Sequence, residues 1–137
     1  MKSSLSILLL IFIMLSCIES ENQFPQTWKI IGHRTYGFGG DTGLISTPDS
    51  TYTYLFNRDG TFLKTVGKET ATGTYEREKR DYQEGGKRTV YILLFPDGKL
   101  AHSCSGPTEQ LFLDNDGILS GGSAPCDGPT NYFEIVK

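Results

Sequence analysis

Few residues of this chain have types that carry chemistry, and most of them stand alone. There are three cysteines, Cys17, Cys104 and Cys126, and two histidines, His33 and His102. Cys17 ends a segment typical of export signals, which leaves Cys104 and Cys126 as an even pair in an oxidising compartment and predicts a disulfide. Such a bridge would add about 3 kcal/mol to the stability of a small domain. The alternative is a metal site of His102, Cys104 and Cys126, but structural zinc sites use closely spaced cysteine pairs and the sequence has none.

No pattern typical of a catalytic or cofactor site is complete. The run Ser-Cys-Ser-Gly at 103–106 lacks the leading glycine of a nucleophile elbow, and the glycines at 37, 39 and 43 miss the spacing of a dinucleotide-binding loop. The run Asp-Asn-Asp-Gly at 114–117 has the composition of a calcium loop, but Phe112 stands where the first ligand belongs, so we expect a turn. We therefore expect no catalytic residue, no cofactor, no metal and no enzymatic activity.

The first residues predict an exported lipoprotein. Lys2 supplies a positive charge, residues 5–15 are mostly apolar, and Ser16 precedes Cys17. The apolar run is too short to span a membrane, because crossing requires about 20 such residues. Residues 14–17 (Met-Leu-Ser-Cys) resemble the lipobox of bacterial lipoproteins, in which the cysteine becomes the acylated first residue of the mature protein. The alternative is an ordinary signal peptide that carries a cysteine by chance.

This resemblance implies a division of the chain and a location. We expect residues 1–16 to be a helical signal peptide and residues 17–26 to be the lipidated Cys17 with a flexible tether. The protein would then be anchored to a membrane of the bacterial cell envelope, with the outer membrane expected. Glu19 and Glu21 are too few acidic residues to decide between the periplasmic and the surface face.

The charge pattern argues against nucleic acid as a partner. The chain has 13 Lys+Arg and 16 Asp+Glu, and removal of Lys2 with the signal leaves 12 against 16, a net charge of −4. Phosphate binding needs clustered basic residues, whereas Arg77 and Lys79 alternate with Glu76 and Glu78. This alternation predicts a solvated strand end rather than a pair of catalytic carboxylates. We expect a monomer that does not bind nucleic acid.

After residue 26 the sequence predicts short strands separated by tight turns. Apolar residues do not recur at helical spacing, and runs rich in β-branched and aromatic residues are bounded by Asp-Gly and Gly-Gly. The expected strands are 27–31, 51–57, 61–66, 73–76, 88–95, 99–104, 109–113, 118–120 and 131–136. We therefore expect an all-β fold, a small antiparallel up-and-down barrel of about eight strands, over residues 27–137.

Residues 35–50 form the one long connection. They contain several glycines with interspersed aromatic residues and show no strand pattern. Loops of this length in compact domains are often lids or binding loops. The alternative is that Leu44 and Ile45 plug one end of the barrel.

Four segments resemble the lipocalin-like domains of bacterial lipoproteins. They are Thr-Trp-Lys-Ile at 27–30, Tyr-Leu-Phe-Asn-Arg-Asp-Gly-Thr-Phe at 54–62, Thr-Gly-Thr-Tyr at 72–75 and Tyr-Phe-Glu at 132–134. The resemblance covers the domain after the tether. It implies a barrel with Trp28 packed at its closed end and the long first loop over its mouth.

Two functions follow as expectations. The first is non-catalytic binding of a small apolar or amphipathic molecule in the barrel mouth, an interpretation that rests on fold-level analogy. The candidate lining residues are Trp28, Tyr36, Phe38, Tyr52, Tyr54, Phe62 and Tyr75. The alternative is a protein-interaction or inhibitor-like envelope lipoprotein whose barrel is filled by its own side chains. A cavity of about 300 Å³ or more favours the first function, and a solid interior with exposed aromatic residues favours the second.

Overall fold

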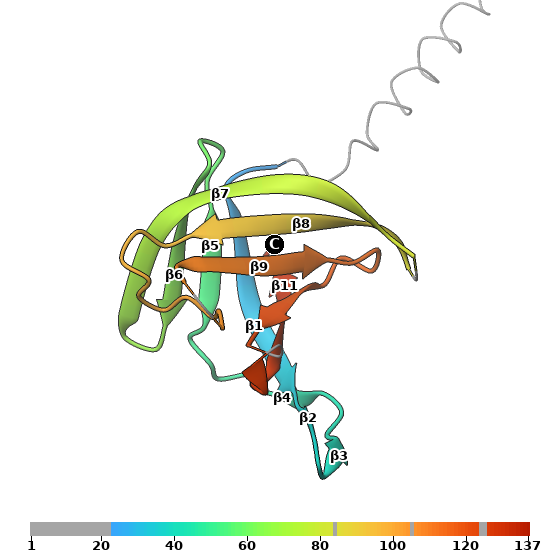
Figure 1. The fold of residues 1–137 in the computed structure, drawn as a ribbon. Coiled ribbons are helices and arrows are strands. Elements are labelled where there is room, and N and C mark those ends of the chain that lie inside the picture. The colour runs from blue at the N-terminus through green and yellow to red at the C-terminus, as the bar shows by residue number, and fades with distance from the viewer. Residues whose placement is uncertain (1–22, 84, 105, 124–125) are drawn as a thin grey trace, which may run out of the picture.

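The structure is a computed structural model that describes residues 23–83, 85–104, 106–123 and 126–137. Its strands are β1 (Gln26–Arg34), β2 (Tyr36–Gly37), β3 (Gly40–Asp41), β4 (Ile45–Ser46), β5 (Thr53–Phe56), β6 (Thr61–Val66), β7 (Glu69–Tyr82), β8 (Gly86–Leu94), β9 (Thr108–Leu113), β10 (Leu119–Gly122) and β11 (Thr130–Ile135). Eight of them, β1 and β5 to β11, pair in chain order, and pairing of β11 with β1 closes the barrel (Figure 1). The predicted all-β barrel is thus confirmed. The expected signal helix at 1–16 and Cys17 lie outside the described residues.

Tight turns form where the sequence predicted them. Asp59 Oδ1 accepts a hydrogen bond from Thr61 N at 3.0 Å, and Gly60 has a φ of 83°, a conformation that glycine adopts at little cost. At the other predicted turn, Asp114 Oδ1 accepts from the backbone nitrogens of Asp116 and Ile118. Residues 114–117 are therefore a turn, as expected.

Aromatic side chains fill the interior of the barrel. Side chains alternate between the inside and the outside along each strand, so that Tyr54 and Phe56 on β5 and Phe62 on β6 are buried. The ring of Phe56 lies 4.8 Å from that of Tyr91, and Phe62 lies 4.8 Å from Phe95, centroid to centroid. The centre of this small barrel is therefore filled by its own aromatic side chains.

Near the start of β1, the buried Trp28 and Gln26 share a polar contact. The Trp28 side chain is only 3% exposed. Gln26 Oε1 accepts hydrogen bonds from Tyr91 OH at 3.1 Å and from Trp28 Nε1 at 3.4 Å. The Trp28 side chain is therefore part of the buried core.

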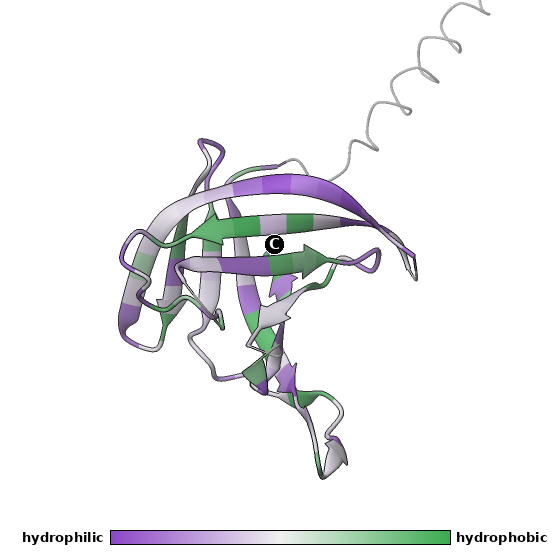
Figure 2. Cartoon of the chain, viewed as in Figure 1, coloured by the Kyte–Doolittle hydropathy of each residue, from purple (hydrophilic) through white to green (hydrophobic). Residues whose placement is uncertain are grey.

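Strand β7 extends well beyond the predicted 73–76. Its charged half pairs with β8, from Glu76 opposite Ile92 to Asp81 opposite Lys87. Figure 2 shows this half of β7 as a hydrophilic band beside the hydrophobic β8. The alternating charged residues are mostly exposed to solvent, as expected. Backbone pairing with β8 continues through this part of β7 although its side chains are not buried.

The predicted strand at 99–104 is wrong, because this segment is a loop. Leu100 has a φ of 60°, which interrupts an extended backbone. The Leu100 carbonyl accepts a hydrogen bond from Lys64 Nζ at 2.7 Å, and the His102 N–H donates to Glu109 Oε2 at 3.1 Å. Buried side chains thus satisfy the backbone groups that a neighbouring strand would otherwise bind.

The connection at 35–50 also differs from its prediction. It contains the hairpin β2–β3, which projects away from the barrel (Figure 1), and β4, which pairs with Gly32 and His33 of β1. Leu44 is 55% exposed and Ile45 is 44% exposed. The segment therefore neither lies over the barrel mouth nor plugs it.

Candidate functional site

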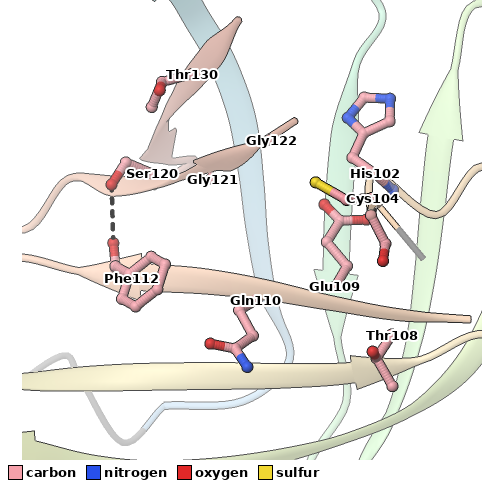
Figure 3. Close-up of a pocket in the computed structure, with 11 residues that line it drawn as sticks. His102, Cys104, Thr108, Glu109, Gln110, Phe112, Ser120, Gly121, Gly122 and Thr130 are labelled. Carbon is pink, nitrogen blue, oxygen red and sulfur yellow. Dashed lines mark hydrogen bonds between the residues drawn. The ribbon is translucent and has the colours of Figure 1, made fainter. Parts of the chain in front are cut away.

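A pocket of about 520 Å³ opens between β9 and the β10–β11 hairpin (Figure 3). Strands β9 and β10 pair only from Leu111↔Gly121 to Leu113↔Leu119. Toward the start of β9 the two strands separate, and the pocket occupies the gap. Its walls are formed by His102, Ser103, Cys104, Thr108, Glu109, Gln110, Phe112, Ser120, Gly121, Gly122 and Thr130.

Two glycines on β10 shape this gap. A Cβ on Gly121 would lie 2.4 Å from Leu111 Cδ2 and 2.8 Å from the Gln110 carbonyl oxygen. Gly122 has a φ of 141°, and a Cβ there would lie 2.4 Å from the Pro129 carbonyl oxygen. Glycine thus permits the close approach of the backbones and leaves this wall of the pocket without side chains.

A disulfide ties together the two loops beside the pocket. Cys104 and Cys126 are bonded, with their Cα atoms 5.5 Å apart, as predicted. The bridge joins the loop before β9 to the loop between β10 and β11. Because the two sulfur atoms are bonded to each other, they are not available as the ligands of the alternative metal site. Within the described residues no group of three His, Cys, Asp or Glu side chains is placed to hold a metal ion.

An ion pair lies inside the barrel behind the pocket. Lys64 Nζ is 2.8 Å from Glu109 Oε2, and both side chains are fully buried. Lys64 Nζ also lies 5.1 Å from the ring centre of Tyr54 and 5.4 Å from that of Phe95, distances at which a cation is attracted to an aromatic face. The charges are therefore paired and surrounded by polarisable groups, which a buried ion pair requires to be stable.

Hydrogen bonds connect this ion pair to the wall of the pocket. Tyr54 OH donates to Glu109 Oε1. Tyr54 OH lies 3.0 Å from Tyr52 OH, which in turn lies 3.0 Å from His102 Nδ1. His102 is partly exposed and lines the pocket. A continuous chain of polar atoms therefore runs from the buried carboxylate to the pocket.

Burial shifts the pKa values of the groups along this chain. It raises the pKa of Tyr54 well above its usual value, and the Glu109 charge adds to this effect. It lowers the pKa of Lys64, although the Glu109 carboxylate opposes the shift. Burial also lowers the pKa of His102, and the Lys64 charge lowers it further. His102 is therefore neutral at pH 7, and the tyrosines keep their protons.

The seven predicted ligand residues lie in three places, none of them on the wall of this pocket. Four are buried in the core, namely Trp28, Tyr52, Tyr54 and Phe62. Tyr75 is partly buried, and its hydroxyl donates to the Asn57 carbonyl at 2.7 Å. Tyr36 and Phe38 are exposed on the β2–β3 hairpin. The predicted inward face of the strands exists, but its side chains pack against one another.

The β2–β3 hairpin and β4 form an exposed apolar arm, residues 35–46. It presents Tyr36, Phe38, Leu44 and Ile45 to solvent. Arg34 Nε donates to Asp41 Oδ1 at 2.6 Å, and Gly43 N donates to the same oxygen at 2.9 Å. The backbone of the arm is therefore held while its apolar side chains remain exposed.

Sequence reasoning missed Lys64, Glu109 and the role of His102. A signal was present, because alternation places Lys64 on the same face as Phe62, and Glu109 on the same face as Leu111. Two opposite charges on inward faces predict an internal pair, since an unpaired buried charge is very costly. No local pattern indicates that residue 102 meets them.

No family model, no curated protein and no solved structure matches this chain. In the described part of the chain, no helix has the length and apolar character needed to cross a membrane. The pocket and its hydrogen-bond chain are therefore the basis for inferring a function.

Proposed function

We propose that the protein is a lipid-anchored lipoprotein of the bacterial cell envelope that binds a small amphipathic molecule without catalysis. The binding site is the pocket between β9 and β10. The observation that carries this proposal is the pocket itself, because its volume of about 520 Å³ falls in the range of small-molecule sites, about 300–1,000 Å³. Its wall combines the Phe112 ring with hydroxyl and amide groups.

The packing of the barrel supports this location. Tyr54, Phe56 and Phe62 occupy the centre and are at most 1% exposed, so the aromatic face of the strands serves stability. The gap beside β9 lies next to the filled core, and the disulfide holds the adjacent loops. A rigid wall of this kind reduces the entropic cost of binding.

The pocket is tested by filling it. Thr108 is exposed on β9 and lines the pocket, so Thr108→Trp places an indole in the opening. Thr53→Trp is the matched control, because Thr53 is a partly exposed threonine on β5, a strand that contributes no residue to the pocket wall. The full chain is expressed with its signal, extracted in detergent and analysed by native mass spectrometry. We expect a co-purifying small molecule in the wild type and in Thr53→Trp, and its loss in Thr108→Trp.

Two outcomes would contradict the proposal. One is a wild-type protein that is consistently free of any bound molecule. The other is a bound molecule that persists in Thr108→Trp.

A second function, contact with a protein partner, is favoured by the apolar arm. Phe38 is fully exposed, and Tyr36 is 57% exposed, and exposed apolar clusters of this kind mark interaction surfaces. A photo-crosslinking residue at position 38 should give one crosslinked species of defined mass in the bacterium that makes the protein. The control position is Lys68, in the turn between β6 and β7. Equal crosslinking at both positions would contradict the proposal that the apolar arm contacts a protein partner.

A further inference from the structure

The ion pair determines the direction of every hydrogen bond that leads to the pocket. Glu109 Oε2 forms a salt bridge with Lys64 Nζ, and the oxygens of a carboxylate in such a pair only accept hydrogen bonds. Tyr54 must therefore use its single proton to donate to Glu109 Oε1. Its oxygen then accepts from Tyr52 OH, 3.0 Å away. Because the Tyr52 hydroxyl already donates its proton to Tyr54, its oxygen accepts a hydrogen bond from His102 Nδ1 at 3.0 Å.

This order fixes the tautomer of His102. The imidazole is neutral, because burial and the Lys64 charge lower its pKa, and its one proton is on Nδ1. The Nε2 atom consequently carries a lone pair. Within the described residues no hydrogen bond reaches Nε2, and His102 is one of the residues that line the pocket.

We propose that His102 Nε2 is a hydrogen-bond acceptor for the ligand, and that the ligand is a neutral polyhydroxylated molecule, of the chemical class of a saccharide. This inference rests on the proposed function and names the ligand class of the same pocket. A group that faces Nε2 must donate a hydrogen bond, and a hydroxyl does so without bringing a charge.

The rest of the wall fits the same class. Hydroxyl and amide groups come from Ser103, Thr108, Gln110, Ser120 and Thr130, and none of the eleven lining residues is a lysine or an arginine. The Glu109 carboxylate already accepts from Lys64, Tyr54 and the His102 backbone. A charged ligand would therefore lose its hydration without gaining a partner of opposite charge.

Two wall groups have further features that suit a sugar ring. Gln110 Oε1 accepts from Arg80 Nη1 at 3.2 Å, which leaves its amide hydrogens to donate to a ligand oxygen. Phe112 supplies an apolar surface, against which the C–H face of a pyranose can pack while its hydroxyls reach the polar groups. Gln110 and Phe112 lie on the outward face of β9 with Thr108, so the lining residues offer a donor and an apolar surface in addition to the His102 acceptor.

In this arrangement Lys64, Glu109, Tyr54 and Tyr52 are positioning residues. They act through His102. Their side chains are buried, including that of Glu109, a residue that contributes to the pocket wall. Tyr52→Phe removes the acceptor for Nδ1–H and frees the imidazole to adopt either tautomer. Its expected effect is a smaller loss of affinity than removal of Nε2 itself.

The test uses four neutral sugars, glucose, galactose, mannose and N-acetylglucosamine, with glucuronic acid and glucosamine as charged counterparts. Saturation-transfer NMR on the detergent-extracted full chain measures binding. We expect at least one neutral sugar to bind, and the charged counterparts to bind at least tenfold more weakly. His102→Asn keeps an N–H donor near Tyr52 but lacks Nε2, so it should lower the affinity about tenfold at an unchanged melting temperature.

Long-range ¹H–¹⁵N correlation on the wild type provides a second readout, which should report a protonated Nδ1 and an unprotonated Nε2. The inference is overturned if no neutral sugar binds, if the charged counterparts bind equally well, or if Nε2 carries the proton. The proposed function fails separately, when the co-purifying molecule is absent or is unaffected by Thr108→Trp. A molecule that is lost in Thr108→Trp but is not a sugar would retain the function and reject the ligand class.

Discussion

At the scale of single residues, Glu109 shows how the interior of this barrel tolerates charge. Its carboxylate is fully buried and accepts from Lys64, Tyr54 and the backbone of residue 102. Each oxygen therefore has a donor. Removing one partner of such a pair leaves the other charge buried without compensation, which costs more than the pair contributes.

We predict that Lys64→Met lowers the free energy of unfolding by about 3–5 kcal/mol, because it leaves the Glu109 charge unpaired. The double variant Lys64→Met/Glu109→Leu should recover most of this loss. Urea unfolding at pH 7 measures both. Lys99→Met is the control, since Lys99 is half exposed and lies 3.8 Å from Glu69, and it should cost less than about 1 kcal/mol. Equal effects of Lys64→Met and Lys99→Met would contradict the buried pair.

His102 makes stability depend on pH. Its pKa is lowered from 6.5 in the folded protein, so the unfolded chain binds the proton first as the pH falls, and stability decreases from about pH 7 toward the folded pKa. Lys64, Glu109 and Tyr52 are the titratable groups that face the imidazole. His102→Asn should flatten the loss of stability between pH 7 and pH 5 in urea titrations. Asp41, whose pKa is lowered to about 2, changes the stability only at lower pH. A wild-type protein of constant stability over this window would refute the assignment.

At the scale of elements, the loop between β8 and β9 positions the site. It brings the Leu100 carbonyl to Lys64 and the backbone and ring of His102 to Glu109 and Tyr52. The disulfide from Cys104 then fixes this loop to the one that follows β10. The pocket wall therefore depends on a covalent link between two loops.

We predict that the double variant Cys104→Ser/Cys126→Ser loses about 3 kcal/mol of stability, because the bridge restricts the unfolded chain over a sequence separation of 22. Urea unfolding with and without dithiothreitol measures the effect. Reduced wild type should behave like the double variant, and the double variant should not respond to the reductant. If reduction left the wild-type midpoint unchanged, the bridge would not contribute to stability.

Most of the barrel strands, the tight turns and the disulfide could be predicted from the sequence, whereas the pocket could not. Tyr54 and Phe56 alternate with polar residues, and Asp59-Gly60 specifies its own turn, so local pattern was sufficient there. Residues 99–104 were wrongly predicted as a strand. Their backbone forms hydrogen bonds with Lys64 and Glu109, which lie on two other strands, and no local sequence pattern indicates such contacts. The residues that line the pocket likewise come together only when β9 and β10 separate.

At the scale of the whole molecule, the barrel is a filled scaffold with its features at one end. Trp28 and Gln26 are buried near the start of β1. The pocket and the apolar arm lie where β1 ends, since Arg34 pairs with Thr130 of the pocket wall. In the proposed lipoprotein, the tether joins the barrel at the start of β1, at the opposite end of this strand from the pocket and the arm.

We predict that Cys17 is the attachment point. In cells fed an alkyne-labelled fatty acid, the wild-type protein should carry the label and remain in the membrane fraction. Cys17→Ala should lose the label and become soluble, since several acyl chains on one residue are needed for stable anchoring. The control Cys104→Ser should keep the label. A labelled Cys17→Ala variant would place the lipid elsewhere.

The pairing of the first barrel strand with the last has a consequence for truncated forms of the protein. β1 pairs with β11 near the other end of the chain, whereas the acceptors of the Lys64 ammonium lie 36 and 45 residues after Lys64. A chain that lacks β11 leaves β1 and β10 each with an unpaired sheet edge, although both acceptors of Lys64 are already present. Ring closure therefore requires the last strand, and a truncation that removes it should yield an aggregation-prone, protease-sensitive product rather than a slightly smaller barrel.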